Sequence, residues 1–108
     1  MSHLPENWRE TPDAHGWVPD PENPVRIVCA ANKAADGTIF CGSRHASNAM
    51  FSQMQAAGVQ YHETEDGFID QYDRWWSRLQ AFEIMATTGQ PMLHAGEWGV
   101  ELYSENLY

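Results

Sequence analysis

The stretch VRIVCAANKAADGTIFCG, residues 25–42, decides the fold. It holds two runs of strand-forming residues, 25–31 and 38–42, and such runs bounded by polar turns predict strands. Asp36-Gly37 lies between them and is a strong hairpin turn signal, so we expect an antiparallel hairpin. Apolar residues take both alternating positions of the first run, which predicts a central strand covered on both faces.

Directly after the hairpin the apolar residues recur at steps of three and four, which is typical of a helix. The pattern predicts a helix over about residues 44–57. Ser43 and Ser47 are both candidate N-caps, and Gly58 is placed as a C-cap glycine. The small apolar stripe of this helix is expected to pack on the sheet.

A second helix is predicted after a short strand at 67–70 and a turn at 71–74. Ser77 and Gln80 form a capping box, and the helical pattern continues to Thr88 and stops at Gly89. Trp75 and Trp76 are adjacent and cannot both face one core on a regular element, so we expect one of them to be partly exposed.

The ends of the chain differ from its middle. Residues 1–24 hold five of the six prolines and no apolar period, which predicts an extended arm. Trp8 and Trp17 are expected to pack this arm onto the body or a partner. Residues 90–99 should form a loop, and the tail 100–108 should begin as a strand and dock. The prediction is an α+β protein, with the arm at 1–24 and a single domain at 25–108, in which two helices pack on a small antiparallel sheet made of the hairpin and one or two short strands.

Composition excludes several function classes. The net charge is −9, from 15 acidic and 6 basic residues, so nucleic acid and anionic membranes repel the chain. This acidity either only keeps the protein soluble, or it imitates nucleic acid or docks on a basic partner. No signal peptide, membrane-length apolar run or C-x-x-C pair occurs. We therefore expect a cytoplasmic protein with Cys29 and Cys41 reduced, and without cofactor or metal.

Candidate ligand-binding residues lie around the predicted helix starts. Arg44 and His45 open the first helix, where backbone amides and a cation can hold a phosphate. Phe68 or Trp76 could stack on a base, and Arg78 could add a second cation. Three of these assignments have a plainer alternative: a surface pair for Arg44 with a nearby acid, core packing for Phe68, and contact with the arm for the second tryptophan.

Several short motifs taken together resemble a family of small phage and prophage proteins of unassigned biochemical function. The motifs are the hairpin, Arg44-His45, Gly67-Phe68-Ile69-Asp70, an Arg78-x-x-Ala-Phe helix, Gly89-Gln90 and the tail Leu-Tyr-Ser-Glu-Asn-Leu-Tyr at 102–108. The resemblance covers residues 25–108 and leaves out the arm. The chain departs from it at 72–76, where the family pattern more often shows a glycine and one aromatic. The resemblance adds Gln90, Ser104 and Glu105 to the candidate site.

The resemblance implies a phage protein of the host cytoplasm, and small phage proteins without an enzymatic motif often oppose host defence by binding. Three hypotheses follow. The first, slightly favoured, is a non-enzymatic protein, expected to form a homo-oligomer, that sequesters a small nucleotide signal through Arg44, His45 and Arg78. The second is an acidic inhibitor, or nucleic-acid mimic, whose acidic face or tryptophan-bearing arm binds a basic site on a host effector such as a CRISPR complex. The third is a phosphodiesterase with His45 as acid or base.

Overall fold

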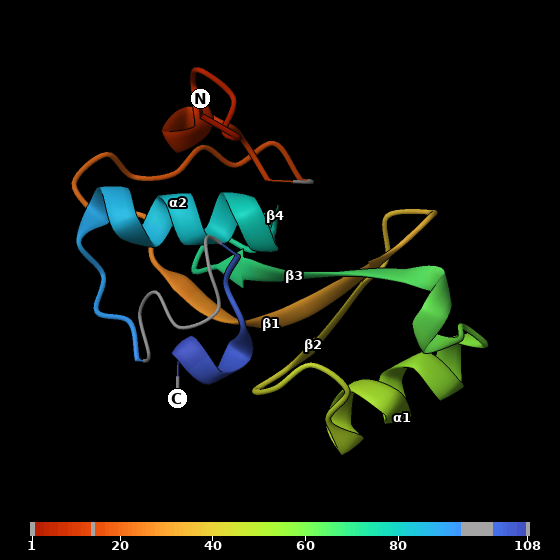
Figure 1. Cartoon of the computed structure of the whole chain (residues 1–108). Coiled ribbons are helices and arrows are strands. Elements are labelled where there is room, and N and C mark those ends of the chain that lie inside the picture. Colours follow the sequence, from red (N-terminus) through yellow and green to blue (C-terminus); the bar gives the residue numbers. More distant parts are fainter. Residues whose placement is uncertain (1, 14, 94–100, 108) are drawn as a thin grey trace.

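The computed structural model describes residues 2–13, 15–93 and 101–107, apart from the side chain of Glu105. These residues form one antiparallel sheet in the order β2-β1-β3-β4 and two α-helices, which confirms the predicted α+β class (Figure 1). The elements are η1 (Trp8–Glu10), β1 (Ile27–Ala34), β2 (Ile39–Gly42), α1 (Asn48–Ala57), η2 (Tyr61–Glu63), β3 (Thr64–Asp70), β4 (Trp75–Ser77), α2 (Arg78–Thr88) and η3 (Ser104–Asn106), where η marks a short 3₁₀ helix.

The hairpin forms as predicted, with Ala30 opposite Gly42 and Lys33 opposite Ile39. β1 is central in the sheet because β3 pairs with its other edge. Two strand predictions need correction: β3 begins at Thr64 rather than Gly67, and Trp75–Ser77 forms the edge strand β4. The acidic residues of β3 concealed its start, since charged residues are depleted in strands unless they find partners.

The helix boundaries follow the capping residues. α1 begins at Asn48 instead of 44, because Ser47 is the N-cap and its hydroxyl accepts a hydrogen bond from the amide of Met50. Arg44 and His45 therefore lie in the turn before α1. α2 begins at the predicted capping box of Ser77 and Gln80 and ends at Gly89, as predicted.

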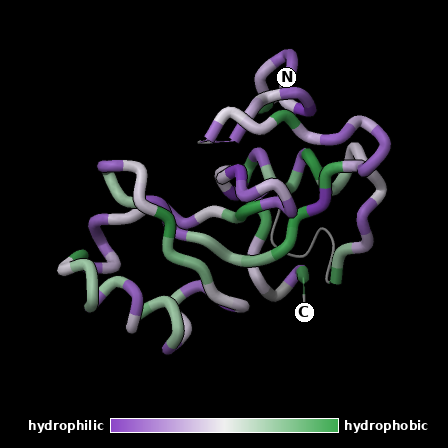
Figure 2. Tube along the Cα trace, turned by 180° about the vertical axis from the view of Figure 1, so that it is seen from behind, coloured by the Kyte–Doolittle hydropathy of each residue, from purple (hydrophilic) through white to green (hydrophobic). Residues whose placement is uncertain are grey.

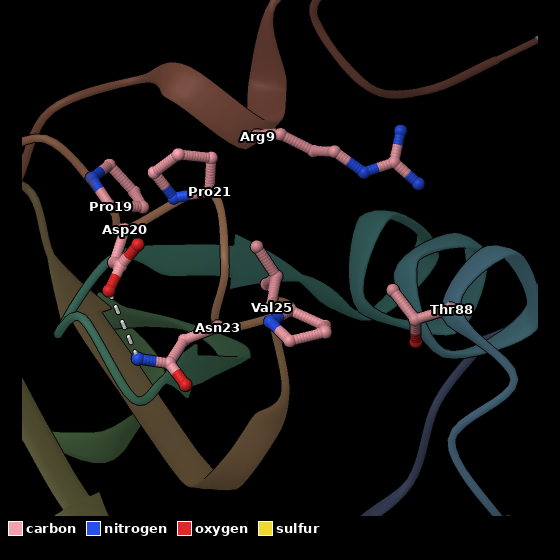
Figure 3. Close-up of a pocket in the computed structure, with 8 residues that line it drawn as sticks. Arg9, Pro19, Asp20, Pro21, Asn23, Val25 and Thr88 are labelled. Atoms are coloured by element: carbon pink, nitrogen blue, oxygen red, sulfur yellow. Dashed lines mark hydrogen bonds between the residues drawn. The ribbon is translucent and has the colours of Figure 1, made fainter.

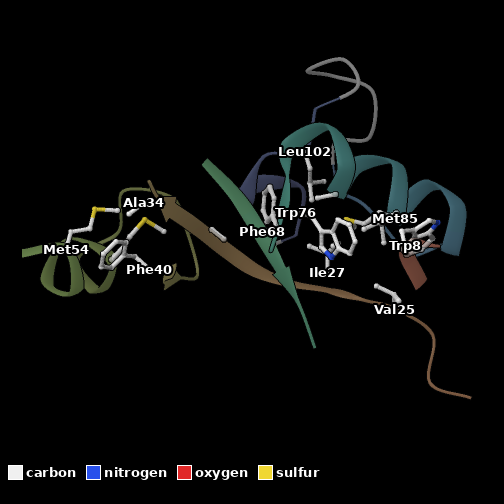
Figure 4. Close-up of a cluster of buried hydrophobic side chains, with 14 residues drawn as sticks. Trp8, Val25, Ile27, Ala34, Phe40, Met54, Phe68, Trp76, Met85 and Leu102 are labelled. Carbon is white, nitrogen blue, oxygen red and sulfur yellow. The ribbon is translucent and has the colours of Figure 1, made fainter. Parts of the chain in front are cut away.

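Both helices cover the same face of the sheet. The strand register puts Gly42, Ala30, Phe68 and Trp76 in one row across that face. Figure 4 shows the buried side chains in two groups along β1. Phe40 and Met54 pack beside α1, whereas Phe68, Trp76, Ile27, Met85 and Leu102 pack beneath α2.

The expectation of a central strand covered on both faces is met only in part. No α-helix of the described chain covers the other face of β1, where Cys29 and Lys33 are half-buried. Trp75 lies across Gly67, where an added Cβ would come within 2.4 Å of its ring. Its indole N–H donates to the carbonyl of Ala31 at 2.9 Å, and the Lys33 amine lies 4.2 Å from the ring centre. A glycine at position 67 is thus required by the tryptophan beside it.

The arm is held at several points and includes the short helix η1. Trp8 is buried and meets Trp76 edge to face, with ring centres 6.2 Å apart. Trp17 does not pack on the body: 76% of its surface is exposed. Figure 2 shows the mostly hydrophilic arm running outside the more hydrophobic strands. The described part of the tail, 101–107, docks as predicted, with Leu102 fully buried, but it forms η3 and no strand.

Candidate functional site

A cleft opens where the start of α2 faces η2 and β3. It has a volume of about 420 Å³, and its floor is the ion pair of Asp66 and Arg78. The Arg78 guanidinium donates to Asp66 Oδ2 at 2.9 Å, and Tyr61 and Asn32 donate to Asp66 Oδ1 at 2.8 and 2.6 Å. Three donors from three different elements thus converge on one carboxylate.

This carboxylate is held in its charged form. Burial alone would raise the pKa of Asp66, but the hydrogen bonds from Arg78, Tyr61 and Asn32 outweigh burial and lower that pKa below 3.8. Burial raises the pKa of the Tyr61 hydroxyl above 10.0, and its bond to Asp66 adds to the effect. Neither group is therefore suited to proton transfer near neutral pH.

Arg78 is also committed to the tail of the chain. Its second nitrogen donates to the carbonyl of Leu102 at 2.9 Å, and its guanidinium lies 4.6 Å from the ring centre of Tyr103. A phosphate that bound Arg78 would have to compete with Asp66 and would meet Glu65 and Glu101, which also line the cleft.

A second ion pair, between Asp70 and Arg74, lies deeper on the same strand. Their side chains are 0% and 4% exposed, and the two are joined by a 2.8 Å hydrogen bond. The indole N–H of Trp76 donates to the same carboxylate oxygen, and Arg74 also donates to the carbonyls of Trp8 and Thr11. This pair ties the arm to the sheet.

The predicted anion site at Arg44 and His45 has a different geometry from the one expected. Ala46 has a left-handed φ of +59°, and His45 lies over the sheet. Its Nε2 lies 2.7 Å from the carbonyl oxygen of Gly67, and its ring meets Phe68 edge to face at 4.9 Å. The first amides of α1 lie beyond the N-cap Ser47, and Arg44 is half-buried in the same turn.

The aromatic residues predicted to stack on a base are core residues. Phe68 is 0% exposed and Trp76 is 5% exposed. The two are paired across β3 and β4, and His45 packs on Phe68 from the other side. The fold thus brings His45, Phe68 and Trp76 together, and a base could reach the rings of Phe68 and Trp76 only if the core opened.

The residues that the resemblance added are also structural, as far as the structure describes them. Gln90 makes two hydrogen bonds with the backbone of Ile27, each of 2.8 Å, and so takes the place of a missing neighbouring strand. Gln53 binds both backbone groups of Cys41 on the edge strand β2 in the same way. Ser104 is buried in η3. The side chain of Glu105 lies outside the described part of the molecule.

A further hollow, of about 240 Å³, lies between the arm and the end of α2 (Figure 3). Prolines form much of its wall, and Asp20 and Asn23 bind each other there at 3.3 Å, so its polar groups serve the turn. Within residues 2–13, 15–93 and 101–107, no group of three or more His, Cys, Asp or Glu side chains is placed to hold a metal ion.

Sequence reasoning found Arg78 but missed its carboxylate partner and the buried pair beside it. A signal was present: Asp66 and Asp70 are four residues apart around Phe68, so on a strand all three share one face. Charges on a buried face need partners, and Arg74 and Arg78 follow within reach. Asn32 and Tyr61 gave no comparable signal, because only the sheet register and η2 bring them to Asp66.

The fold and the comparisons define the class of this molecule as a small α+β phage protein. The family model of the phage T4 y16D protein matches residues 26–108, and the chain belongs to that family. The match confirms the resemblance to a phage family and leaves the arm outside it. Searches of curated proteins and of solved structures found no match. Among the described residues, no helix is long and apolar enough to cross a membrane.

Proposed function

We propose that this phage protein is a non-enzymatic inhibitor that opposes host defence in the host cytoplasm by binding a basic surface of a host protein. The observation that carries the proposal is the internal use of its cations. Arg74 and Arg78 form ion pairs with Asp70 and Asp66, and they also donate hydrogen bonds to backbone carbonyls. The net charge of −9 is therefore displayed by the side chains that remain on the surface.

The exposed acids support this proposal by their spread. Among the residues that the structure describes, they are Glu6, Glu10, Asp20, Glu22, Asp36, Glu63, Glu65, Asp73 and Glu101. They occur on the arm, on the hairpin turn, in the turn between β3 and β4, and around the cleft. A surface of this kind attracts Lys- and Arg-rich proteins over several ångströms, steers their encounter and repels nucleic acid.

Sequestration of a nucleotide signal is the second candidate. One feature favours it: Tyr61 and Arg78 line the same cleft, a ring beside a cation. It ranks below the inhibitor because Asp66 already neutralises Arg78, and because Phe68 and Trp76 are buried. A phosphodiesterase activity has the least support, since His45 is bonded to Gly67 and packed on Phe68.

Native mass spectrometry of the protein captured from phage-infected host cells separates these functions. We expect a host protein of basic charge in stoichiometric amounts, and we expect the purified complex to weaken at least about tenfold when monovalent salt rises from about 50 to 500 mM. A small mass released by denaturation would favour the nucleotide hypothesis instead. A complex whose affinity ignores salt would contradict the acidic-surface proposal.

A further inference from the structure

Trp17 and Val18 are the two most exposed of the large apolar residues in the described chain, at 76% and 63%. They are adjacent and lie on the arm. Single exposed apolar residues are ordinary on protein surfaces, so exposure alone assigns no role. The same arm buries Trp8, which shows that the body can accept a tryptophan from the arm while leaving Trp17 in solvent.

The loop that carries Trp17 is closed by its own hydrogen bonds. One oxygen of Asp13 accepts from the amides of His15 and Trp17 at 2.8 and 3.0 Å. The Asp13 amide in turn donates to the carbonyl of Trp17 at 3.0 Å. These bonds lower the pKa of the Asp13 carboxyl, chiefly through the Trp17 amide, and the charged form therefore keeps the loop closed at neutral pH.

The body holds this loop from both sides. Arg74 donates to the carbonyl of Thr11 just before it, at 3.0 Å. The Tyr72 hydroxyl lies 2.8 Å from the carbonyl of Asn23 and 3.3 Å from that of Asp20 just after it. A tryptophan displayed on a fixed loop loses little conformational entropy when it binds, and this is the condition under which an aromatic anchor contributes strongly to affinity.

The charge around the loop indicates the chemistry of the occupant. Residues 13–22 contain Asp13, Asp20 and Glu22 but no lysine or arginine. In space, Lys33 shares a hollow with Asp13, and Arg9 shares one with Asp20, so the acids around the loop outnumber the cations without excluding them. An apolar anchor with such a mainly acidic border fits an apolar pocket that has a basic rim. A second copy of this acidic chain would be repelled at that border, and so would a nucleic acid.

We propose that Trp17, with Val18 beside it, is the anchor that inserts into an apolar pocket bordered by Lys and Arg on the host protein. The proposal rests on the inhibitor function above, because it names the contact by which that inhibitor would hold its partner. Interface anchors of this type are enriched in tryptophan, and their truncation costs about 2 kcal/mol or more, or about thirtyfold in affinity.

The test compares Trp17→Ala with a matched control, Phe51→Ala. Phe51 is an exposed aromatic residue, 45% exposed, on α1 and away from the arm (Figure 1). Wild type and both variants, as full chains, capture proteins from the same infected host cells, and the captured protein is then purified for titration calorimetry. We expect Trp17→Ala to bind about thirtyfold more weakly with an unchanged thermal midpoint, and Phe51→Ala to bind as wild type does.

The outcomes separate the two proposals. If wild type and Trp17→Ala bind the same host protein equally well and with the same salt dependence, the anchor is overturned and the inhibitor function stands. If wild type enriches no host protein over an untagged control, the inhibitor function fails and the anchor fails with it. Equal weakening by Phe51→Ala would also overturn the assignment, since it would place the contact elsewhere.

Discussion

Two ion pairs beside β3 each attach a terminal segment of the chain to the sheet, but they differ in burial. Asp70–Arg74 and Asp66–Arg78 both start from the helix-covered face of β3. In each, the arginine uses its remaining donors on the backbone of a terminal segment: Arg74 holds the arm at Trp8 and Thr11, and Arg78 holds the tail at Leu102. The family match includes both arginines and the tail but excludes the arm that Arg74 holds.

The pairs differ in their access to water. The side chains of the Arg74 pair are 4% and 0% exposed, whereas those of the Arg78 pair are 18% and 30% exposed and line the cleft. A fully buried pair is costly to break, because the partner left behind is an uncompensated charge. When one partner of a half-exposed pair is removed, water can solvate the charge that remains. The comparison teaches that the first pair is structural, and that changes at the second can separate binding from stability.

Arg74→Met removes one partner of the buried ion pair, and it has the largest expected effect on stability. The change leaves the buried Asp70 carboxylate without its cation and removes two hydrogen bonds to the arm. We therefore expect the free energy of unfolding to fall by about 3–5 kcal/mol. Urea denaturation measures this change. The double variant Arg74→Met/Asp70→Leu removes both charges and should recover part of the loss. A loss below about 1 kcal/mol for the single variant would contradict the structural role.

Asp66→Asn tests the open side and should cost less, about 1–2 kcal/mol at pH 7, because water can reach Arg78. The pKa of Asp66 is lower in the folded chain than in the unfolded chain. Its stabilising contribution is therefore complete above about pH 4 and is lost as the pH falls through the lower, folded pKa.

The measurement is the urea midpoint of wild type and Asp66→Asn at pH 7 and at pH 2.5. The gap between the two proteins should shrink at the lower pH. Asp36 and Glu83 also have lowered pKa values and remain in both proteins, so they cancel in the comparison. A gap that stays constant with pH would mean that the charge of Asp66 is not what stabilises the chain.

Much of the secondary structure could be predicted from local patterns along the sequence. The Asp36-Gly37 turn, the capping box of Ser77 and Gln80, and the helix end at Gly89 all act through neighbouring residues, and each is confirmed. The strand β4 was not predicted, because its two tryptophans take opposite faces only once β3 pairs with it.

The site was harder to predict because its residues have their roles through distant contacts. The sequence shows that Arg78 is a cation, but only the fold shows that it contacts Asp66, Leu102 and Tyr103. Phe68 shows the same limit, because the ring of a Gly-Phe pair can either stack on a ligand or pack in a core. The sheet register places this ring in the core.

The opposite face of the same sheet extends the comparison, because a pair of thiols there takes the place of an ion pair. Cys29 and Cys41 lie on the neighbouring strands β1 and β2, are half-buried and form no disulfide bond. The hydrogen bond from the Cys41 thiol lowers the pKa of Cys29 from 9.0 to about 7, against burial and the charge of Asp73. The same hydrogen bond raises the pKa of Cys41, so Cys29 is expected to be the reactive thiol.

Cys41→Ala removes the donor and should let the pKa of Cys29 return toward 9.0 with little effect on stability. At pH 7 its thiolate fraction then falls about fiftyfold, and a thiolate of higher pKa is about tenfold more nucleophilic, so alkylation of Cys29 should slow about fivefold. Iodoacetamide labelling followed by mass spectrometry gives this rate. Cys41→Ser is the matched control, because its hydroxyl can still donate and should keep Cys29 fast. If the alanine and serine variants react at the same rate, burial and Asp73 set the reactivity of Cys29, and a hydrogen bond from position 41 does not.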